Sequence, residues 1–351
     1  MARVTIKDIA EQADVSPATV SRFLNKRYGS MSPETRDRIA RVIERTGYKP
    51  NNAARSLRLD RTNTIGVILA DIRNPFSSAM LEELSQQAAQ RGCSIVTAIS
   101  SNSAQAEKEA LERLVDAGVD GIIVNTCSND PAPLKAIATT KPVVLLDRNV
   151  EGVDFSLVTS NNAALIDELL DEFQQAGCTR YHLLTERDET SSVRRGRADR
   201  FEREIRRRGL SGCVLALDPD AGRAAAQIDA CLEPVGTLND NADATTLDKP
   251  VTGFIAINGL VFLRFVEALG LTDTVVPRDA LVATFDEYPW NHVLFGGVTT
   301  AVQDTAGLAA AALEQLFDAI DRLGKRGGRM PAPRHVEVPG TIIPRASSRP
   351  C

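Results

Sequence analysis

The chain has 351 residues, of which 43% are hydrophobic and 25% charged, so it has enough apolar mass for two or three globular units. Its six cysteines lie far apart with no Cys-x-x-Cys pair, which argues against a zinc site or a disulfide framework. The N-terminus has no apolar signal core and no apolar run approaches 18 residues, so we expect a cytoplasmic protein that is neither secreted nor inserted into a membrane.

The net charge of −5 is divided unevenly along the chain. Residues 1–61 carry 13 Lys and Arg against 7 Asp and Glu, a net charge of +6, whereas the remaining residues carry 28 against 39, a net charge of −11. A small basic head on an acidic body is typical of a protein whose head meets phosphate while its body stays away from it.

Residues 5–25 predict two short helices that meet at a tight corner. Thr5 and Asp8 have the spacing of a capping box at the start of the first helix. Asp14 lies at the corner between the helices, where a left-handed backbone is needed. Ser16 followed by Pro17 begins the second helix. The apolar positions that hold the two helices together are Ile6, Ile9, Ala10, Ala13, Val15, Val20 and Leu24.

The outer face of the second helix is small, polar and basic, as a surface that enters the DNA major groove must be. It consists of Pro17, Ala18, Ser21, Arg22 and Asn25. Arg22 is the best candidate for a bidentate contact to guanine. Phosphate contacts that set the register are expected from Thr5, Ser16, Thr19, Ser21, Asn25 and Thr35. An ordinary helical hairpin with a solvated face would show the same local pattern.

A third helix and a linker follow the predicted helix-turn-helix. Ser32 and Pro33 open the third helix by the same combination of a cap and a proline, and Gly47 ends it. Residues 48–58 then have the length of a helix but too few apolar side chains to stabilise one. We therefore expect this linker to fold only against a second copy of the chain or against DNA.

Five short motifs in the head and linker belong together: Asp8-Ile9-Ala10, Val15-Ser16, Thr19-Val20-Ser21-Arg22, Leu24-Asn25 and Tyr48-x-Pro50-Asn51-x-x-Ala54-Arg55-Ser56-Leu57. In these motifs the chain resembles the LacI/GalR family of bacterial repressors. The resemblance implies that the linker is a hinge helix, which pairs across a dimer and pushes Leu57 into the minor groove of the operator, with Ala54 one turn away. It also implies base contacts at Pro17 and Ala18.

After Thr62 the pattern changes to apolar strands that alternate with helices, which indicates parallel sheets covered on both faces. A first set comprises strands at 64–70, 94–99, 120–125 and 143–147, with helices near 77–91 and 105–116. After a helix near 163–176, a second set comprises strands at 181–184, 214–217, 253–257 and 281–285, with helices at 197–208 and 259–269. The predicted fold class is therefore α/β: a three-helix head and a hinge helix, then two doubly wound parallel-sheet lobes like those of periplasmic binding proteins.

These patterns predict the domain organisation. We expect a DNA-binding head at 1–48, a hinge helix and linker at 49–61, an effector-binding and dimerisation core at 62–345 and a tail at 346–351. Within the core we expect an N-lobe at 62–160 and 293–328 and a C-lobe at 161–292 and 329–345. The tail lacks the leucine heptads that could make a tetramer, which favours a dimer.

Polar residues follow several predicted strands, and ligands of such folds bind at the carboxyl ends of strands. Side chains placed there to hydrogen-bond sugar hydroxyls are Asp71, Asn74, Asp147, Arg148, Asn258 and Asp286, while Phe76 and Trp290 offer apolar faces. The family resemblance adds Arg197, from a segment that usually reads Arg-x-x-Gly-Phe and here reads Arg197-Ala-Asp-Arg200-Phe201. The family's Pro-x-Thr-Thr is also altered, to Gly297-Val298-Thr299-Thr300.

Arg194, Arg195 and Arg197 gather at the predicted start of a helix. They are either part of a solvated helix face or a fixed positive field for an anionic ligand. Residues 23–35 also resemble the branch of the family that includes 2-keto-3-deoxygluconate regulators. Together these features favour a sugar acid, such as 2-keto-3-deoxygluconate, as an effector that contacts Arg195 and Arg197.

Two other classes of protein fit less well. A periplasmic-type sugar-binding protein shares the two-lobed fold, but it has no use for residues 1–58 and would need a signal peptide. A dinucleotide-dependent enzyme would need a Gly-x-Gly cradle, which the chain lacks, and the three histidines lie far apart without metal-ligand spacing. We therefore expect a transcriptional repressor of carbohydrate catabolism that has no catalytic residue, metal or cofactor.

The predicted mechanism has two states. A homodimer presents two heads to a palindromic operator, because two-fold protein symmetry requires two half-sites. An effector bound between the lobes changes their relative angle, separates the hinge helices and lets them melt. Since this linkage is reciprocal, DNA must weaken effector binding by the same factor. Corepression would use the same linkage with the opposite sign.

Overall fold

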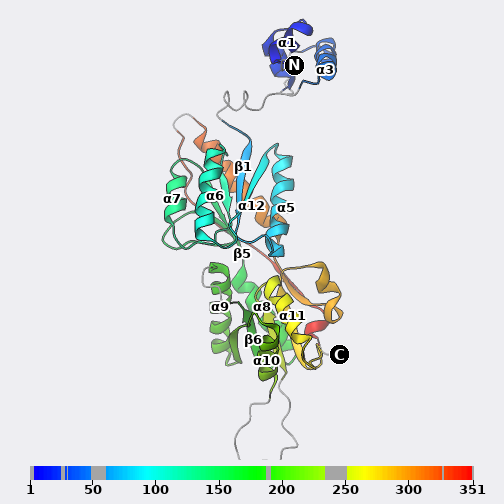
Figure 1. Ribbon diagram of the computed structural model, residues 1–351, viewed down its shortest axis with the longest axis vertical. Helices are drawn as coiled ribbons and strands as arrows, with labels where there is room; N and C mark the ends of the chain where they lie inside the picture. The colour runs from blue at the N-terminus through cyan, green and yellow to red at the C-terminus, as the bar shows by residue number, and fades with distance from the viewer. Residues whose placement is uncertain are drawn as a thin grey trace, which may run out of the picture. The chain divides into compact units, whose positions relative to one another are not determined.

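The computed structural model in Figure 1 describes residues 4–24, 28–29, 31–48, 61–186, 191–233, 251–325 and 328–349. It separates into two compact units, residues 1–62 and 63–351, which are called here the head and the body. Each unit is described by itself. Within the described residues, no helix combines the length and apolar character needed to cross a bilayer.

The head is a bundle of three helices: α1 (Ile6–Gln12), α2 (Pro17–Leu24) and α3 (Pro33–Thr46). The predicted starts of all three are confirmed, since the side chains of Thr5, Ser16 and Ser32 each accept a hydrogen bond from the backbone N–H three residues later. The capping box is complete, because Asp8 Oδ2 accepts from the Thr5 N–H at 2.8 Å. Asp14 turns the corner with φ +48°, as expected of the position.

A small apolar core holds the head together. It consists of Ile9, Ala10, Ala13, Val20, Met31, Ile39 and Val42, with contributions from all three helices. Of the predicted linker, residues 49–60 lie outside the described residues, and so do Asn25, Asn51, Ala54 and Leu57. The hinge helix therefore stays a prediction.

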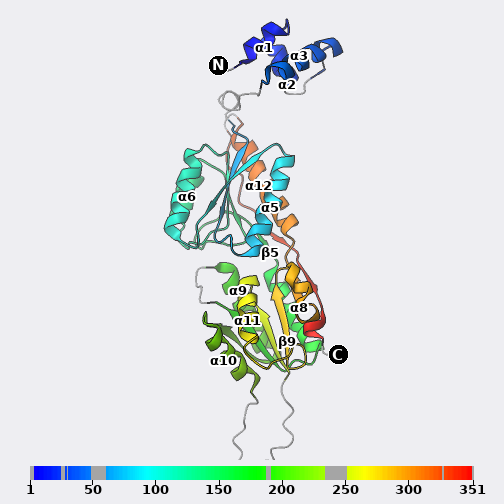
Figure 2. The same ribbon diagram turned by 45° about the vertical axis from the view of Figure 1, so that its right-hand side comes forward.

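The first lobe of the body is built on a parallel six-stranded sheet in the order β11-β5-β4-β3-β1-β2. Its strands are β1 (Thr64–Leu69), β2 (Ser94–Ile99), β3 (Ile122–Val124), β4 (Val143–Leu146), β5 (Ser156–Ser160) and β11 (His335–Val338). Its helices are α5 (Pro75–Gln90), α6 (Ala104–Asp116), α7 (Ala132–Ala138) and α12 (Thr305–Leu323). Figure 2 shows α6 on one face of the sheet and α5 with α12 on the other, and a separate apolar cluster fills each side.

The second lobe repeats this plan in the order β12-β10-β9-β8-β6-β7. Its strands are β6 (Arg180–Thr185), β7 (Ser211–Ala216), β8 (Thr252–Ala256), β9 (Ala280–Phe285), β10 (Thr299–Val302) and β12 (Thr341–Ile343), of which β12 alone in this sheet runs antiparallel to its neighbour. The helices are α8 (Asn162–Gln175), α9 (Ser192–Arg208), α10 (Ala221–Leu232) and α11 (Gly259–Leu269). Short 3-10 turns lie at Pro289–His292, Leu294–Gly296 and Ala346–Ser348. The prediction of two doubly wound lobes is confirmed.

Two strands lie in the opposite lobe from the one expected. Residues 299–302 fell in the predicted N-lobe, but β10 pairs with β9 in the second sheet. Residues 335–338 fell in the predicted C-lobe, but β11 pairs with β5 in the first sheet. The expected boundaries at 293 and 329 were therefore wrong for these strands. The chain crosses between the lobes after β5, after β10 and again between β11 and β12.

Candidate functional site

The outer face of α2 is open to solvent. Its inner face contributes Val20, which is fully buried, whereas Pro17, Ala18 and Arg22 are exposed. The start of the helix is fixed by Ser16, whose Oγ accepts from the Thr19 N–H at 3.2 Å. A rigid helix thus presents one long cationic side chain among short ones, which suits close approach to a groove.

The hydroxyl groups expected to contact phosphate lie mostly at helix starts. Ser16 Oγ and Thr19 Oγ1 are 2.9 Å apart, and Ser32 Oγ and Thr35 Oγ1 are 3.2 Å apart. Thr5 Oγ1 donates to Asp8 Oδ2 at 2.8 Å. Since free backbone N–H groups and the positive end of the helix dipole meet at such positions, they favour an anionic partner. Ser21 lies on α2 between these groups and is half-buried.

A second candidate site is a small cavity of about 20 Å³ between the two lobes of the body. The first lobe contributes Asn74, Phe76, Asp147 and Arg148, and the second contributes Ser191, Val193, Arg194, Arg197, Asn258, Asp286 and Gln303. Such a volume holds about one water molecule, so in this conformation side chains nearly fill the space between the lobes. Seven of the ten residues predicted to contact the effector line this one cavity.

Arg197 is the central cation of this site and is 3% exposed. Its Nη1 donates to the carbonyl of Ile257 at 2.6 Å, and its Nε donates to Asn162 Oδ1 at 2.7 Å. The guanidinium also lies over the ring of Phe285, 3.6 Å from its centroid. Burial lowers the pKa of Arg197, while Asp286 and Asp147 oppose that effect. An arginine held on so many sides is a fixed charge rather than a mobile one.

Asp147 and Asp286 flank this arginine from opposite lobes. Each directly follows a strand, β4 or β9, that has the same place in its sheet, and each has a left-handed backbone, with φ +67° and φ +73°. Burial raises the pKa of both carboxyls, and Arg197 acts to lower it. Within the described residues, Asp147 Oδ1 is buried and accepts no hydrogen bond. A ligand hydroxyl would supply the missing donor.

Gln303 connects the cavity to the crossing between the lobes. Its Nε2 donates to Asp286 Oδ1 at 2.5 Å, and its Oε1 accepts from the Ser160 hydroxyl at 2.7 Å. Ser160 is the last residue of β5, where the chain leaves the first lobe. The prediction missed Gln303 because it follows β10, a four-residue strand that was not expected.

Arg194 lies at the third position of α9, with its side chain 11% exposed. It forms an ion pair with Glu186, at 2.7 Å between Nη1 and Oε1, and Asn258 Nδ2 donates to the same carboxylate oxygen at 3.3 Å. Ser191 caps the helix and lines the cavity. The predicted start of this helix at 197 was five residues late, so Ser191 and Val193 were not among the predicted site residues.

Two predicted residues have other structural roles besides lining the cavity. Asn74 caps α5 through the Phe76 N–H, and Asn258 caps α11 through the Val261 N–H at 2.8 Å. Two further predicted residues lie outside the lining. Asp71 pairs with Arg73 at 2.8 Å, and Arg195 pairs with Glu151 at 3.6 Å. Trp290, also outside the lining, packs on Tyr288 with ring centroids 4.7 Å apart.

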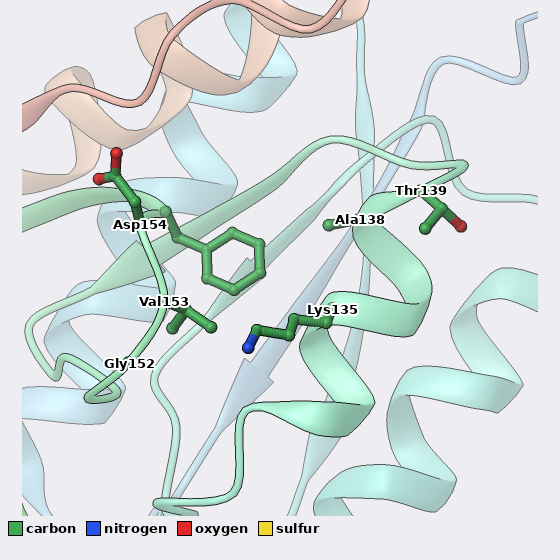
Figure 3. A pocket seen from close by; sticks show the side chains of 7 residues that line it. Lys135, Ala138, Thr139, Gly152, Val153 and Asp154 are labelled. Atoms are coloured by element: carbon green, nitrogen blue, oxygen red, sulfur yellow. The ribbon is translucent and has the colours of Figure 1, made fainter.

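A larger cavity of about 370 Å³ opens on the surface of the first lobe. Figure 3 shows Lys135 of α7 pointing toward Gly152 and Val153 on the loop that leads to β5. All its lining residues belong to one lobe, and none follows a strand at the edge where the polar residues converge. A ligand there would not touch both lobes, so we do not assign the effector to it.

Three family models match the chain. The model "Bacterial regulatory proteins, lacI family" matches residues 5–51. The model "Periplasmic binding proteins and sugar binding domain of LacI family" matches residues 62–251, and a "Periplasmic binding protein-like domain" model matches residues 170–348. The head and the body therefore each match a model that is named for the same family.

Full-length relatives give the same result. The HTH-type transcriptional regulator KdgR of Bacillus subtilis is 29% identical, with 98% of this chain and 97% of that protein covered. The HTH-type transcriptional regulator PtxS of Pseudomonas aeruginosa is 33% identical, with coverages of 99% and 96%. A crystal structure of the Lac repressor dimer bound to operator and an anti-inducer is 20% identical, covers 99% of this chain and 100% of that chain, and has a TM-score of 0.79. At that identity the last comparison supports the fold alone.

Proposed function

This chain belongs to the LacI family of bacterial regulatory proteins, and from that premise we propose that it is a homodimeric repressor that releases its operator when a small sugar or sugar acid binds between its lobes. It is a helix-turn-helix transcriptional regulator, like its full-length relatives. The observation that carries the proposal is the presence, in one chain, of the exposed helix α2 and a polar cavity lined by both lobes.

The head reads the operator through α2. Arg22 makes the bidentate contact to guanine, and Pro17 and Ala18 act by methyl contact or by exclusion. Thr5, Ser16, Thr19, Ser21, Asn25 and Thr35 contact phosphates and set the register. Of the linker residues, which lie outside the described residues, Leu57 is the proposed apolar wedge in the minor groove, and Asn51 and Ala54 are the further proposed DNA contacts. Exposure of Arg22 and the helix-start positions of the hydroxyls support this assignment.

The body supplies the dimer interface. β2 lies at the edge of its sheet and exposes Val96 and Ile99, and α11 exposes Leu263. An open edge strand with apolar side chains favours pairing with another chain, because unpaired backbone groups and apolar area are both left in water. Two copies then present two heads to the two half-sites of a palindrome. Sedimentation that gives a stable monomer or a tetramer would contradict this arrangement.

The effector binds where the lobes face each other. Asp147 and Asp286 accept hydrogen bonds from hydroxyls, Asn74 and Asn258 offer amide groups, and Phe76 covers an apolar face of the ring. Arg148 and Arg197 are hydrogen-bond donors in the same cavity. 2-Keto-3-deoxygluconate is the first candidate to test, since one of the relatives is named KdgR and resembles this chain over nearly its full length.

Control of DNA binding follows from differential affinity. An effector that binds more tightly to one relative angle of the lobes shifts the population toward that angle, and the hinge helices of the operator-bound state then separate. The chain acts by binding alone, in the cytoplasm, and the effector leaves chemically unchanged. The relatives named above are regulators, which supports a role without catalysis.

The test starts with selection of the operator from random DNA by the full-length protein. The selected duplex should be a palindrome, and at least one member of a panel of sugars and sugar acids should release it. Titration of the same effector in the presence of operator should give an affinity lower by the factor by which the effector weakens operator binding. A protein that shows no preference among DNA sequences would refute the proposal, and an effector that tightens the complex would reverse its sign.

A further inference from the structure

We propose that Arg194 binds the carboxylate of the effector and that Glu186 occupies Arg194 until the effector arrives. The proposal rests on the function proposed above and specifies its ligand as a sugar acid, in which a carboxylate and several hydroxyls are recognised by separate groups. In the absence of effector, the Glu186 carboxylate occupies the place of the effector carboxylate, in an ion pair with Arg194 at 2.7 Å.

The first argument compares the three arginines of the cavity. Arg197 is held by Ile257, Asn162 and the face of Phe285, and its charge acts to lower the pKa of two buried aspartates. Arg148 donates to the backbone carbonyl of Thr126 at 3.2 Å, within its own lobe, and also lies near Asp147. The carboxylate partner of Arg194 differs from Asp147 and Asp286, because Glu186 is 21% exposed and so can turn away into water.

The second argument is the balance of charge around the cavity. The charged side chains that line it are three arginines and two aspartates. Glu186 is not among the lining residues, so its charge is not counted here. The formal charges of the lining side chains therefore sum to +1, which gives the cavity a positive potential. A carboxylate in this cavity, whose lining includes the buried side chains of Arg148 and Arg197, would interact with that potential more strongly than it would at an open surface.

The third argument is the position of Arg194 on its helix. α9 is 17 residues long, and Arg194 lies in its first turn directly after the cap residue Ser191, which also lines the cavity. The positive end of the helix dipole adds to the guanidinium charge at this point. Arg194 and the start of the helix thus favour an anion together.

Binding is then an exchange of carboxylates. The effector carboxylate forms a bidentate ion pair with the guanidinium of Arg194, and Glu186 turns to solvent. The Asn258 amide then loses its hydrogen bond to Glu186 and can donate to the ligand instead. A neutral sugar cannot displace Glu186, because hydroxyls replace only part of the ion pair. The site thereby rejects neutral sugars of the same shape.

The test is isothermal titration of the full-length protein with matched probes. The acids are D-gluconate, 2-keto-D-gluconate and 2-keto-3-deoxy-D-gluconate, and the neutral partners are D-glucose and D-glucitol. Arg194→Ala should weaken the tightest acid by roughly ten- to a hundredfold, the range for one charged hydrogen-bonded pair, and Arg194→Lys should restore part of that loss. Glu186→Gln should strengthen acid binding, because it removes the competing charge.

Arg206→Ala is the matched control. It removes the same charge from the same helix, where the Arg206 side chain is 70% exposed in an i,i+4 pair with Glu202 and does not line the cavity. Its affinity for acids should stay close to that of the unmodified protein. Circular dichroism of each variant separates loss of folding from loss of binding.

Several results would overturn the proposal. These are acids binding no better than their neutral partners, equal losses for the Arg194→Ala and Arg206→Ala proteins, or weaker acid binding by the Glu186→Gln protein. Operator titrations run beside the calorimetry keep the two proposals apart. A protein that reads its operator and is released by a neutral sugar keeps the proposed repressor function and loses the carboxylate site.

Discussion

The head and the body present polar side chains to a partner in opposite ways. On α2, Pro17, Ala18 and Arg22 are exposed and the reading face rests on a small apolar core. In the body, Arg197, Asp147 and Asp286 are each less than 10% exposed, and hydrogen bonds hold Arg197 and Asp286 in place. A rigid, ready-made surface suits a large partner such as a duplex, whereas a small ligand has to be enclosed before a few contacts can discriminate it.

This difference predicts where a substitution damages folding and where it damages only recognition. In the body, the side chains proposed to bind the effector also stabilise the fold, because removing one member of a buried charge cluster leaves the others unpaired. In the head, exposed recognition residues can change without a measurable effect on stability. The four predictions below test this contrast, starting with the largest expected effect.

Arg197→Ala should destabilise the body by about 3–5 kcal/mol, since it leaves the Asp147 and Asp286 carboxylates buried without their shared counter-charge. Urea unfolding of the full chain measures the loss. Arg206→Ala is the matched control on the same helix: the side chain is 70% exposed in an i,i+4 pair with Glu202, so the change should stay within about 0.5 kcal/mol. Similar losses for the two variants would show that burial of Arg197 does not matter.

Glu204 should make the body lose stability in acid. Its side chain is 3% exposed, and hydrogen bonds from Arg207, with further contributions from Arg208 and Arg200, lower its pKa to about 2 from an ordinary value of 4.5. Because the folded-state pKa is depressed, the stabilisation is fully present above about pH 4.5 and is lost as the pH falls toward 2. The loss should be on the order of 2–3 kcal/mol.

Glu204→Gln provides the check on this pH dependence. The substitution keeps the shape of the side chain but removes the titrating group, so the unfolding free energy of the variant should change less with pH between 4.5 and 2. If the variant and the unmodified protein show the same slope in that window, other carboxyls cause the acid sensitivity.

Arg22→Ala should reduce operator binding by about 1–3 kcal/mol while leaving unfolding unchanged, because the side chain is exposed and the proposed contact to guanine would be specific. The ratio of affinities for operator and random DNA, measured by fluorescence anisotropy at one salt concentration, should fall. Lys26→Ala is the contrasting variant and should weaken both duplexes alike. Equal losses of the Arg22→Ala protein on both duplexes would remove Arg22 from base readout.

Ser32→Ala and Asp220→Ala remove equivalent helix caps from the head and the body. Ser32 Oγ accepts from the Thr35 N–H at 3.3 Å, and Asp220 Oδ1 accepts from the Arg223 N–H at 2.9 Å. Each loss should be about 1 kcal/mol. Because the head has the smaller unfolding entropy, its melting temperature should fall by about 4–8 °C, against about 2–4 °C in the body. Calorimetry of the full chain that shows equal shifts would contradict two independently unfolding units.

Local chemistry made much of the structure predictable. The caps at Thr5 and Ser32, the left-handed corner at Asp14 and the alternation of apolar strands with helices each depend on neighbours in the chain. Asp147, Arg148 and Asp286 were also predictable, because the carboxyl ends of parallel strands converge. At these positions the local pattern and the final fold require the same residues.

The remaining features depend on contacts between distant segments. The lobe to which β10 and β11 belong is decided by pairing with β9 and β5, and neither four-residue strand shows that choice in its own pattern. The Gln303 bridge depends on the same pairing. The partner of Arg194 became visible only when β6 placed Glu186 beside α9, since eight positions separate the two residues along the chain.

β11 and β12 are separated by only two residues, yet they complete the edges of different sheets. No single cut in the gene can therefore encode either lobe alone: a fragment that stops after α12 loses one border strand from both halves, and a fragment that starts at α8 loses most of the first sheet. Any C-terminal truncation that removes β11 and β12 should damage both lobes together, so deletion mapping cannot assign separate functions to the two lobes.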